Sequence, residues 1–364
     1  MSSPAVNEGG ATGITMEELA LAARNHGMPL EALRYDVTPV GLHYLLIHFD
    51  IPAADEATWR LEVGGEVARP RSLTMAELRR RPAVTLPVTL ECAGNGRARL
   101  DPRPVSQPWL EEAVGTAEWT GTPLRPLLEE AGIGPGAVEV VFGGADRGVQ
   151  GGLEHDYERS LPLAEALREE VLLAWAVNGR PLPPQHGYPL RLVVPSWYGM
   201  SSVKWLRRIE LVGQPFRGYQ QAGSYLLHAS ADDPGVPVTR IQPRSLLAPP
   251  GIPEFESRRR FLPPGRHLLS GRAWSGLAPV AGVEVSTDGG ASWQPADLGE
   301  QPSPWAWVGW SFPWEATEGV HELCSRATDA AGNTQPLEAP WNTGGYANNA
   351  VQRVPVTVHP VAAG

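Results

Sequence analysis

The sequence has few cysteines, no long apolar run and no excess of positive charge. Its two cysteines, Cys92 and Cys324, lie far apart, and it contains no Cys-x-x-Cys pair, which argues against a disulfide framework, an iron–sulfur centre and an attached haem. No apolar stretch approaches the roughly 20 residues of a membrane-spanning helix. With 30 Lys and Arg against 40 Asp and Glu, the net charge of −10 disfavours nucleic acid and anionic membrane surfaces as partners.

The first residues lack a recognisable targeting signal. They contain no twin arginine and no apolar signal core. We therefore expect a cytoplasmic protein, or a periplasmic one if residue 1 is a processed end, and scarce cysteine fits a reducing compartment. Residues 1–14 are mostly small and polar and are predicted to form a flexible tail.

What is abundant points to a large globular protein rich in loops. A length of 364 residues suggests two domains, and 42% hydrophobic residues can fill substantial cores. The 40 glycines and 37 prolines favour a β-containing fold with many turns over a helical bundle.

Residues 15–235 are predicted to form an irregular α+β domain. Thr15, with Glu18 three residues later, is a capping pattern at the start of an Ala- and Leu-rich helix. A strand is expected at 59–63, with Gly64-Gly65 as its turn. The elements follow no regular βαβ order, which disfavours a doubly wound sheet. Further short helices are expected at 74–80, 122–132 and 163–170, and further strands at 84–90, 138–142, 172–177 and 190–194.

Residues 236–364 are predicted to form an all-β sandwich. Turn-forming residues punctuate 232–265 without a clear helix. Cys324 falls in a later strand-like run and is interpreted as a core thiol without a functional role. Short strands typical of a β-sandwich are expected at 283–287, 305–310, 321–327 and 351–358.

The run from residue 89 to residue 97 is the strongest functional signal. It reads Thr-Leu-Glu-Cys-Ala-Gly-Asn-Gly-Arg, so that Cys92 follows a predicted strand and precedes a sharp turn and the cation of Arg97. A thiol at a rigid strand end beside positive charge suits a nucleophile or a soft-metal ligand. The alternative is a buried cysteine that acts only as a small hydrophobe.

Further motifs follow in a fixed order. Residues 178–183 read Asn-Gly-Arg-Pro-Leu-Pro, residues 186–191 read His-Gly-Tyr-Pro-Leu-Arg, and residues 203–206 read Val-Lys-Trp-Leu. Together with the Cys92 run and later blocks at 271–276, 286–290 and 305–307, they resemble the sulfite oxidase family from about residue 37 to the end. The resemblance implies a molybdopterin-binding domain, then an immunoglobulin-like dimerisation domain, and hence a homodimer.

The resemblance also implies a molybdenum cofactor and the residues that hold it. Molybdopterin is an anionic ligand that ends in a phosphate, which calls for cations and N–H donors. Cys92 matches the family's metal ligand, and Asp146 matches an acidic residue that bonds the pterin. Arg97 matches an arginine of the family's substrate pocket and would supply residual attraction for an anionic substrate. The other residues at cofactor-binding positions are Tyr44, Leu45, Leu46, Ile47, His48, His186, Arg191, Ser202, Val203 and Lys204.

Tyr225 is the candidate for orienting the substrate. It follows Lys204 at the family's spacing, and Tyr219 is the competing candidate. The family implies that this hydroxyl lies beside the metal.

Two substrate-binding arginines of the family are missing here. Leu46 and Val308 stand at their positions. A sulfite dianion in a partly dry pocket needs more than one cation, so sulfite specificity is in doubt although the metal site matches. Arg24-Asn25-His26 repeats the letters of the family's Arg-Asn-His motif, but it lies too early and inside a predicted helix, and is interpreted as coincidence.

The sequence thus favours a molybdenum-cofactor oxidoreductase of the sulfite oxidase type. It would transfer an oxygen atom to or from sulfite or a related small sulfur or nitrogen compound. The alternatives are a reductase of neutral S- or N-oxides and a catalytically silent molybdopterin-binding protein; a cysteine hydrolase is disfavoured, because no histidine and acid form a signature with Cys92. No haem domain is expected, so electrons would pass through a separate carrier such as a cytochrome. The substrate and the direction of flux stay open.

Overall fold

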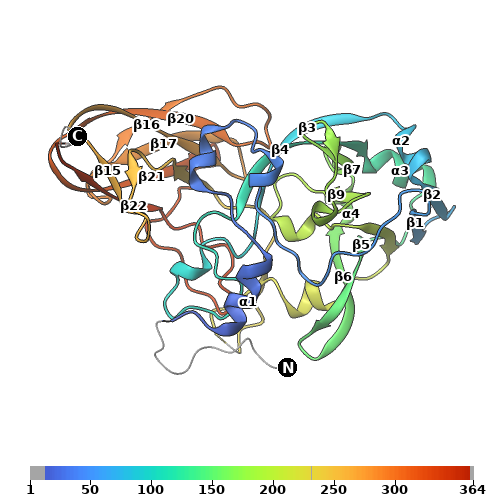
Figure 1. Ribbon diagram of the computed structural model, residues 1–364. Coiled ribbons are helices and arrows are strands. Elements are labelled where there is room, and N and C mark those ends of the chain that lie inside the picture. Colours follow the sequence, from blue (N-terminus) through green and yellow to red (C-terminus); the bar gives the residue numbers. More distant parts are fainter. Residues whose placement is uncertain (1–12, 231, 361–364) are drawn as a thin grey trace.

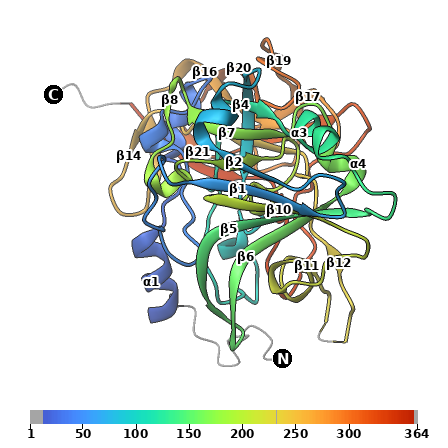
Figure 2. The ribbon, with the colours of Figure 1, turned by 90° about the vertical axis from the view of Figure 1, so that its right-hand side faces the viewer.

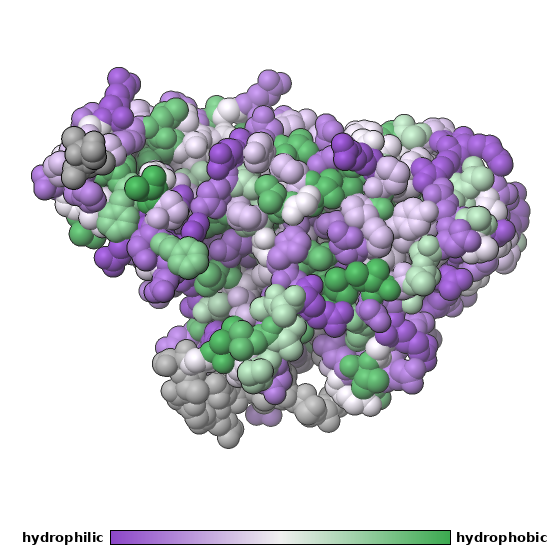
Figure 3. All heavy atoms as spheres, viewed as in Figure 1, coloured by the Kyte–Doolittle hydropathy of each residue, from purple (hydrophilic) through white to green (hydrophobic). Residues whose placement is uncertain are grey.

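Two parts of the molecule lie side by side in Figure 1, with the strands of residues 60–212 on the right and those of residues 244–358 on the left. The computed structural model describes residues 13–230 and 232–360, so most of the predicted flexible tail lies outside the described residues. None of the helices in these ranges combines the length and the apolar character needed to cross a bilayer. The face shown in Figure 3 is largely hydrophilic, with hydrophobic residues scattered over both parts.

One mixed sheet forms the outer wall of the right-hand part. β1 pairs in parallel with β10, and the remaining pairs are antiparallel. Along β1, buried Leu61 and Val63 alternate with more exposed residues, as expected for a strand with one face on the core. Figure 2 looks onto this sheet and shows the β5–β6 hairpin extending below it. In spatial order the strands are β2 (Arg71–Thr74), β1 (Arg60–Gly65), β10 (Leu206–Val212), β5 (Glu139–Gln150) and β6 (Leu153–Pro162).

A second sheet lies inside this part and ends just before Cys92. β3 pairs with β4 up to the pair Glu91 and Val114, and Cys92 is the next residue. The sheet therefore holds the backbone before Cys92 rigidly. Its strands are β3 (Val84–Glu91), β4 (Val114–Pro123), β7 (Leu172–Val177) and β8 (Arg180–Pro181), with β9 (Arg191–Val193) also paired to β7.

Four α-helices follow the predicted positions, with one difference in length. In α1 (Met16–Arg24) both hydrogen bonds of the capping box between Thr15 and Glu18 are present. α2 (Met75–Arg79) has the same arrangement with Thr74, and α3 (Leu124–Ala131) ends at Gly132. α4 (Leu163–Ala166) is shorter than the predicted 163–170, because the residues after it turn toward β7.

The predicted turn at Gly64-Gly65 is wrong. Both residues belong to β1 and pair with Glu210 and Leu211 of β10, so the strand extends past the expected end. A Cβ at Gly65 would collide with the backbone of Leu211, and the φ of +77° also favours glycine. Gly65 therefore allows the close approach to β10 here.

The left-hand part is a sandwich of two sheets, as predicted. Its core is made of buried residues from both sheets, including Leu269, Val285, Trp310 and Val356. Trp305 and Trp307, which were expected in a strand, precede β20 instead. Trp307 is fully buried between the two parts, where its Nε1 donates to the carbonyl of Asp36 at 2.7 Å.

The two sheets of the sandwich differ in size. The smaller sheet contains β13 (Arg244–Leu247), β16 (Gly265–Trp274), β20 (Val308–Ala316) and β19 (Asp297–Leu298). The larger sheet contains β14 (Ile252–Pro253), β15 (Arg260–Leu262), β22 (Arg353–Val358), β21 (Gly319–Asp329), β17 (Val280–Ser286) and β18 (Gln294–Pro295).

A buried ion pair joins the sandwich to the residue before Cys92. Arg244 of β13 donates from Nη1 to Oε1 of Glu91 at 2.9 Å, and both side chains are 2% exposed. Trp274 and Asn95 also donate to this carboxylate, at 2.8 and 3.0 Å. The predicted domain boundary at 235/236 stays a prediction; it falls in the hairpin where β11 (Leu226–Leu227) pairs with β12 (Val236–Pro237).

Replacing Arg244 by Met should destabilise the protein strongly. The substitution leaves the Glu91 charge buried without its cation, a change that costs about 3–5 kcal/mol. In the matched control Arg353→Met, an exposed pair with Glu322 is lost, which costs about 1 kcal/mol or less. Urea unfolding of both variants measures the difference, and equal losses would contradict the role of the buried pair.

Candidate active site

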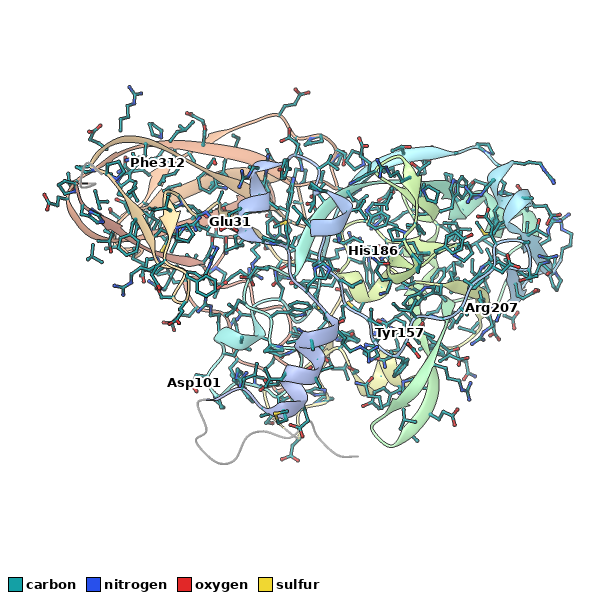
Figure 4. The ribbon with its side chains drawn as sticks, viewed as in Figure 1. Glu31, Asp101, Tyr157, His186, Arg207 and Phe312 are labelled. Carbon is teal, nitrogen blue, oxygen red and sulfur yellow. The ribbon has the colours of Figure 1, made fainter. Side chains whose placement is uncertain are left out.

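One cavity collects most of the predicted site residues. Cys92, Asp146 and Tyr225 line it together, although they are far apart in the sequence. Figure 4 labels two other lining residues, Tyr157 on β6 and His186 in the short turn before β9. The predicted residues that line the cavity are Tyr44, Leu45, Leu46, His48, Cys92, Asp146, His186, Arg191, Ser202, Lys204 and Tyr225.

Three predicted residues are not among those that line the cavity. Ile47 and Val203 are buried beside it, and their backbones hold neighbouring segments: Ile47 N donates to Asn25 Oδ1, and the Val203 carbonyl accepts from Leu192 N. Arg97 donates from Nε to the carbonyl of Gly344 at 2.9 Å and from Nη1 to that of Gln107 at 3.2 Å. This position does not support the expected substrate contact of Arg97.

Cys92 is held at the cavity wall by the end of β3. Its backbone N–H donates to the carbonyl of Ala113 at 2.9 Å, and the residue is 7% exposed. Burial raises the pKa of the Cys92 thiol, and the nearby charge of Arg97 acts in the opposite direction. A thiol in such surroundings is a poor free nucleophile but becomes a thiolate when it binds a soft metal ion.

Two cations approach the cavity without a carboxylate partner among the described residues. Arg191 donates to the carbonyls of His186 and Ser202 at 3.1 and 3.2 Å, while its Nε is buried without a hydrogen bond. Lys204 donates from Nζ to the carbonyls of Leu46 and Gln185 at 2.7 and 3.0 Å. Burial lowers the pKa of Arg191 to about 10 and that of Lys204 to about 7. Both shifts indicate charges that a bound anion would stabilise.

Asp146 brings a carboxyl group to the same cavity. It lies on β5, is 4% exposed, and forms no salt bridge within the described residues. Burial raises its pKa to about 7, and the charge of Lys204 opposes this shift. Such a group can bond the N–H groups of a bound heterocycle.

Three histidines, His43, His48 and His186, line the cavity, and burial disfavours their charged form. Burial lowers the pKa of His186 to about 2 and that of His43 to about 4, and it also lowers the pKa of His48. His43 was missed in the sequence, although it directly precedes Tyr44. Tyr157 was also missed, because no motif marks its strand.

Tyr225 rather than Tyr219 lines the cavity. Its φ of +55° is uncommon for a tyrosine and marks a position fixed by its surroundings. Tyr219 instead packs against His155 with 4.8 Å between ring centres. Val308 lies in the sandwich core, away from the cavity.

The prediction that the Arg24-Asn25-His26 segment lies inside a helix is wrong for Asn25 and His26. α1 ends at Arg24, Asn25 is extended, and His26 forms a β-bridge with Leu45. Arg24 donates from Nη2 to the carbonyl of Phe49 at 2.5 Å. The segment therefore supports the backbone of residues 45–49. It lies beside the residues that stand at the position of the family's Arg-Asn-His motif.

Known families match both parts of the molecule. The oxidoreductase molybdopterin binding domain matches residues 48–220, and the Mo-co oxidoreductase dimerisation domain matches residues 260–359. The chain belongs to the sulfite oxidase family of molybdopterin oxidoreductases. The α+β domain followed by a β-rich dimerisation domain, expected for members of this family, is confirmed.

The names of individual relatives state different enzyme activities. The sulfane dehydrogenase SoxCD from Paracoccus pantotrophus superposes with a TM-score of 0.79 at 28% identity, over 90% of this chain and 82% of that chain. A nitrate reductase [NAD(P)H] from Hordeum vulgare is 36% identical over 350 residues, and nitrate reductase [NADH] 1 from Oryza sativa subsp. japonica is 34% identical over 351 residues. The alignments cover 88% of this chain but only 39% and 38% of these two relatives.

The residues of this sulfite-oxidase-type cavity fit a molybdopterin cofactor. Arg191 and Lys204 can hold its phosphate. Both side chains donate only to backbone carbonyls, and Nε of Arg191 has no hydrogen-bond partner. Asp146 can bond the pterin, and Cys92 offers the soft ligand that molybdenum needs. The chain is thus a molybdopterin-binding oxidoreductase.

Replacing Asp146 by Asn should change how stability depends on pH in the cofactor-free protein. With a pKa of about 7 in the folded state and roughly 4 in the unfolded chain, the folded state binds the extra proton between these values, so wild-type stability falls as pH rises. Asn does not titrate. The free energy of unfolding of the variant, relative to that of the wild type, should therefore rise by roughly 1–3 kcal/mol between about pH 4.5 and pH 8. Urea unfolding at both pH values measures this, and parallel pH profiles would contradict it.

Proposed function

We propose that the protein catalyses oxygen-atom transfer at a molybdenum ion ligated by Cys92, with a small sulfur or nitrogen oxo-compound as substrate. The observation that carries the proposal is the convergence of Cys92, Tyr225 and the unpaired cation Arg191 on one cavity. When bound, the molybdenum cofactor supplies the two-electron redox change of the reaction.

The chain's own residues would bind and orient the reactants. Tyr225 offers a hydroxyl donor to the substrate, and burial raises its pKa, so it stays protonated as a donor. Tyr157 donates its hydroxyl to the carbonyl of Met200 at 2.9 Å and fixes the wall beside it. Ser202 accepts from the backbone N–H of Val194 at 3.1 Å, which positions the loop that carries Lys204.

Two substrate classes are supported by different observations. The nitrate reductases among the relatives support a small oxoanion, either nitrate or sulfite. Leu46, which lines the cavity where the family has an arginine, supports a neutral S- or N-oxide as the second candidate. We further propose a homodimer formed through the dimerisation domain and a separate electron carrier.

Replacing Cys92 by Ser should lower activity by at least about 100-fold while leaving the fold intact, because a hydroxyl is a poor ligand for a soft metal ion. Cys324→Ser is the matched control, since Cys324 is buried in β21 of the sandwich. Turnover and circular dichroism of both holoproteins are measured. Full activity of Cys92→Ser would refute the assignment of the metal ligand.

A substrate panel tests the reaction itself. The holoenzyme is assayed with sulfite and an oxidised dye, and with nitrate or dimethyl sulfoxide and a reduced dye, while its molybdenum content is measured. Turnover of at least one substrate supports the proposal. Stoichiometric molybdenum without turnover of any of them would favour the catalytically silent binding protein.

A further inference from the structure

Arg159 is a buried arginine behind the proposed substrate pocket. It lies on β6 two residues after Tyr157, so both side chains leave the same face of the strand. The side chain is 2% exposed, and its guanidinium carbon is 5.4 Å from the centre of the Tyr225 ring. Tyr157 and Tyr225 both line the cavity, which places the cation directly behind two of its walls.

No carboxylate balances this charge within residues 13–230 and 232–360. Its Nη1 donates to the carbonyl of Gln220, and its Nε is buried without a partner. Burial lowers the pKa of Arg159, and no aspartate or glutamate of the described residues opposes this shift. Arg244, by contrast, is buried beside the carboxylate of Glu91. An unpaired buried cation is costly unless an anion binds near it.

The cations that line the cavity within the described residues, Arg191 and Lys204, are assigned above to the phosphate of the cofactor. Leu46 and Val308 replace the family arginines, and Arg97 is bound to two carbonyls outside the cavity. Given the proposed function, we propose that Arg159 supplies the positive charge that selects an anionic oxo-substrate at Tyr225. The substrate class is then a small oxoanion rather than a neutral oxide.

Arg159 acts through Tyr225 and is a positioning residue. The Tyr225 ring lies near Arg159 and has the Tyr346 ring 5.1 Å away, between ring centres. A cation close to a phenol favours donation of the O–H hydrogen bond to a negatively charged acceptor. Gln220 belongs to the π-helix Tyr219–Gly223, a local distortion that aims its carbonyl at Arg159.

The test compares Arg159→Met and Arg159→Lys in the holoenzyme with anionic and neutral substrates. Arg159→Met should raise the KM for nitrate or sulfite by about tenfold or more and change kcat by less than about threefold. The same variant should leave the KM for dimethyl sulfoxide within about twofold of the wild-type value. Arg159→Lys should retain most of the affinity for the anions. Arg147→Met, which removes an exposed arginine paired with Glu154 and Asp156, is the control. Equal effects of Arg159→Met on anionic and neutral substrates would overturn the proposal.

A binding measurement separates this proposal from the proposed function. Sulfate should raise the thermal midpoint of wild-type holoenzyme at constant ionic strength and raise that of Arg159→Met much less. The same sulfate effect in both proteins would overturn the role of Arg159. Failure of all turnover would count against the proposed function alone. If Arg159→Met yields no holoenzyme, Arg159→Gln, which keeps a donor for the Gln220 carbonyl, replaces it with the same outcomes.

Discussion

The buried carboxylate of Glu91 fixes Cys92 relative to both parts of the molecule. It accepts hydrogen bonds from Arg244 and Trp274 of the sandwich and from Asn95 of the cysteine loop. Asn95 in turn accepts from the backbone N–H of Ala113, whose carbonyl binds Cys92 N. A metal ligand must be held within fractions of an ångström, and this network connects its backbone to the sandwich. The sandwich thus helps to fix the position of Cys92 at the cavity.

The cavity itself is built from charges that the protein leaves unsatisfied. Arg191 and Lys204 donate to backbone carbonyls, and Asp146 is buried without a salt bridge among the described residues. In an isolated protein these groups reduce stability, because desolvated charges are costly. An anionic cofactor that ends in a phosphate offsets that cost, so the same groups give affinity. Stability of the empty fold and affinity for the cofactor therefore oppose each other at this site.

The part of the cavity around Leu46 and Tyr225 has fewer charged groups than the part around Arg191 and Lys204. Leu46 makes one wall apolar, and Tyr225 is held at a positive φ. Arg159 adds a cation from behind the wall instead of at its surface. A charge that does not touch the substrate attracts it less strongly. It also takes up no volume in the cavity, which leaves room for an oxoanion beside Tyr225.

The sequence alone determined the family, the order of the two domains and most elements of the lining, because a cysteine loop and three short motifs carry the chemistry in contiguous letters. It also predicted α1 from the Thr15 and Glu18 capping pair, a purely local interaction. Only the tertiary structure showed that Arg97 donates to backbone carbonyls and does not line the cavity, that His26 pairs with Leu45, and that Arg159 lies beside the Tyr225 ring. These contacts join residues distant in the chain, and side-chain direction depends on packing that no local pattern encodes.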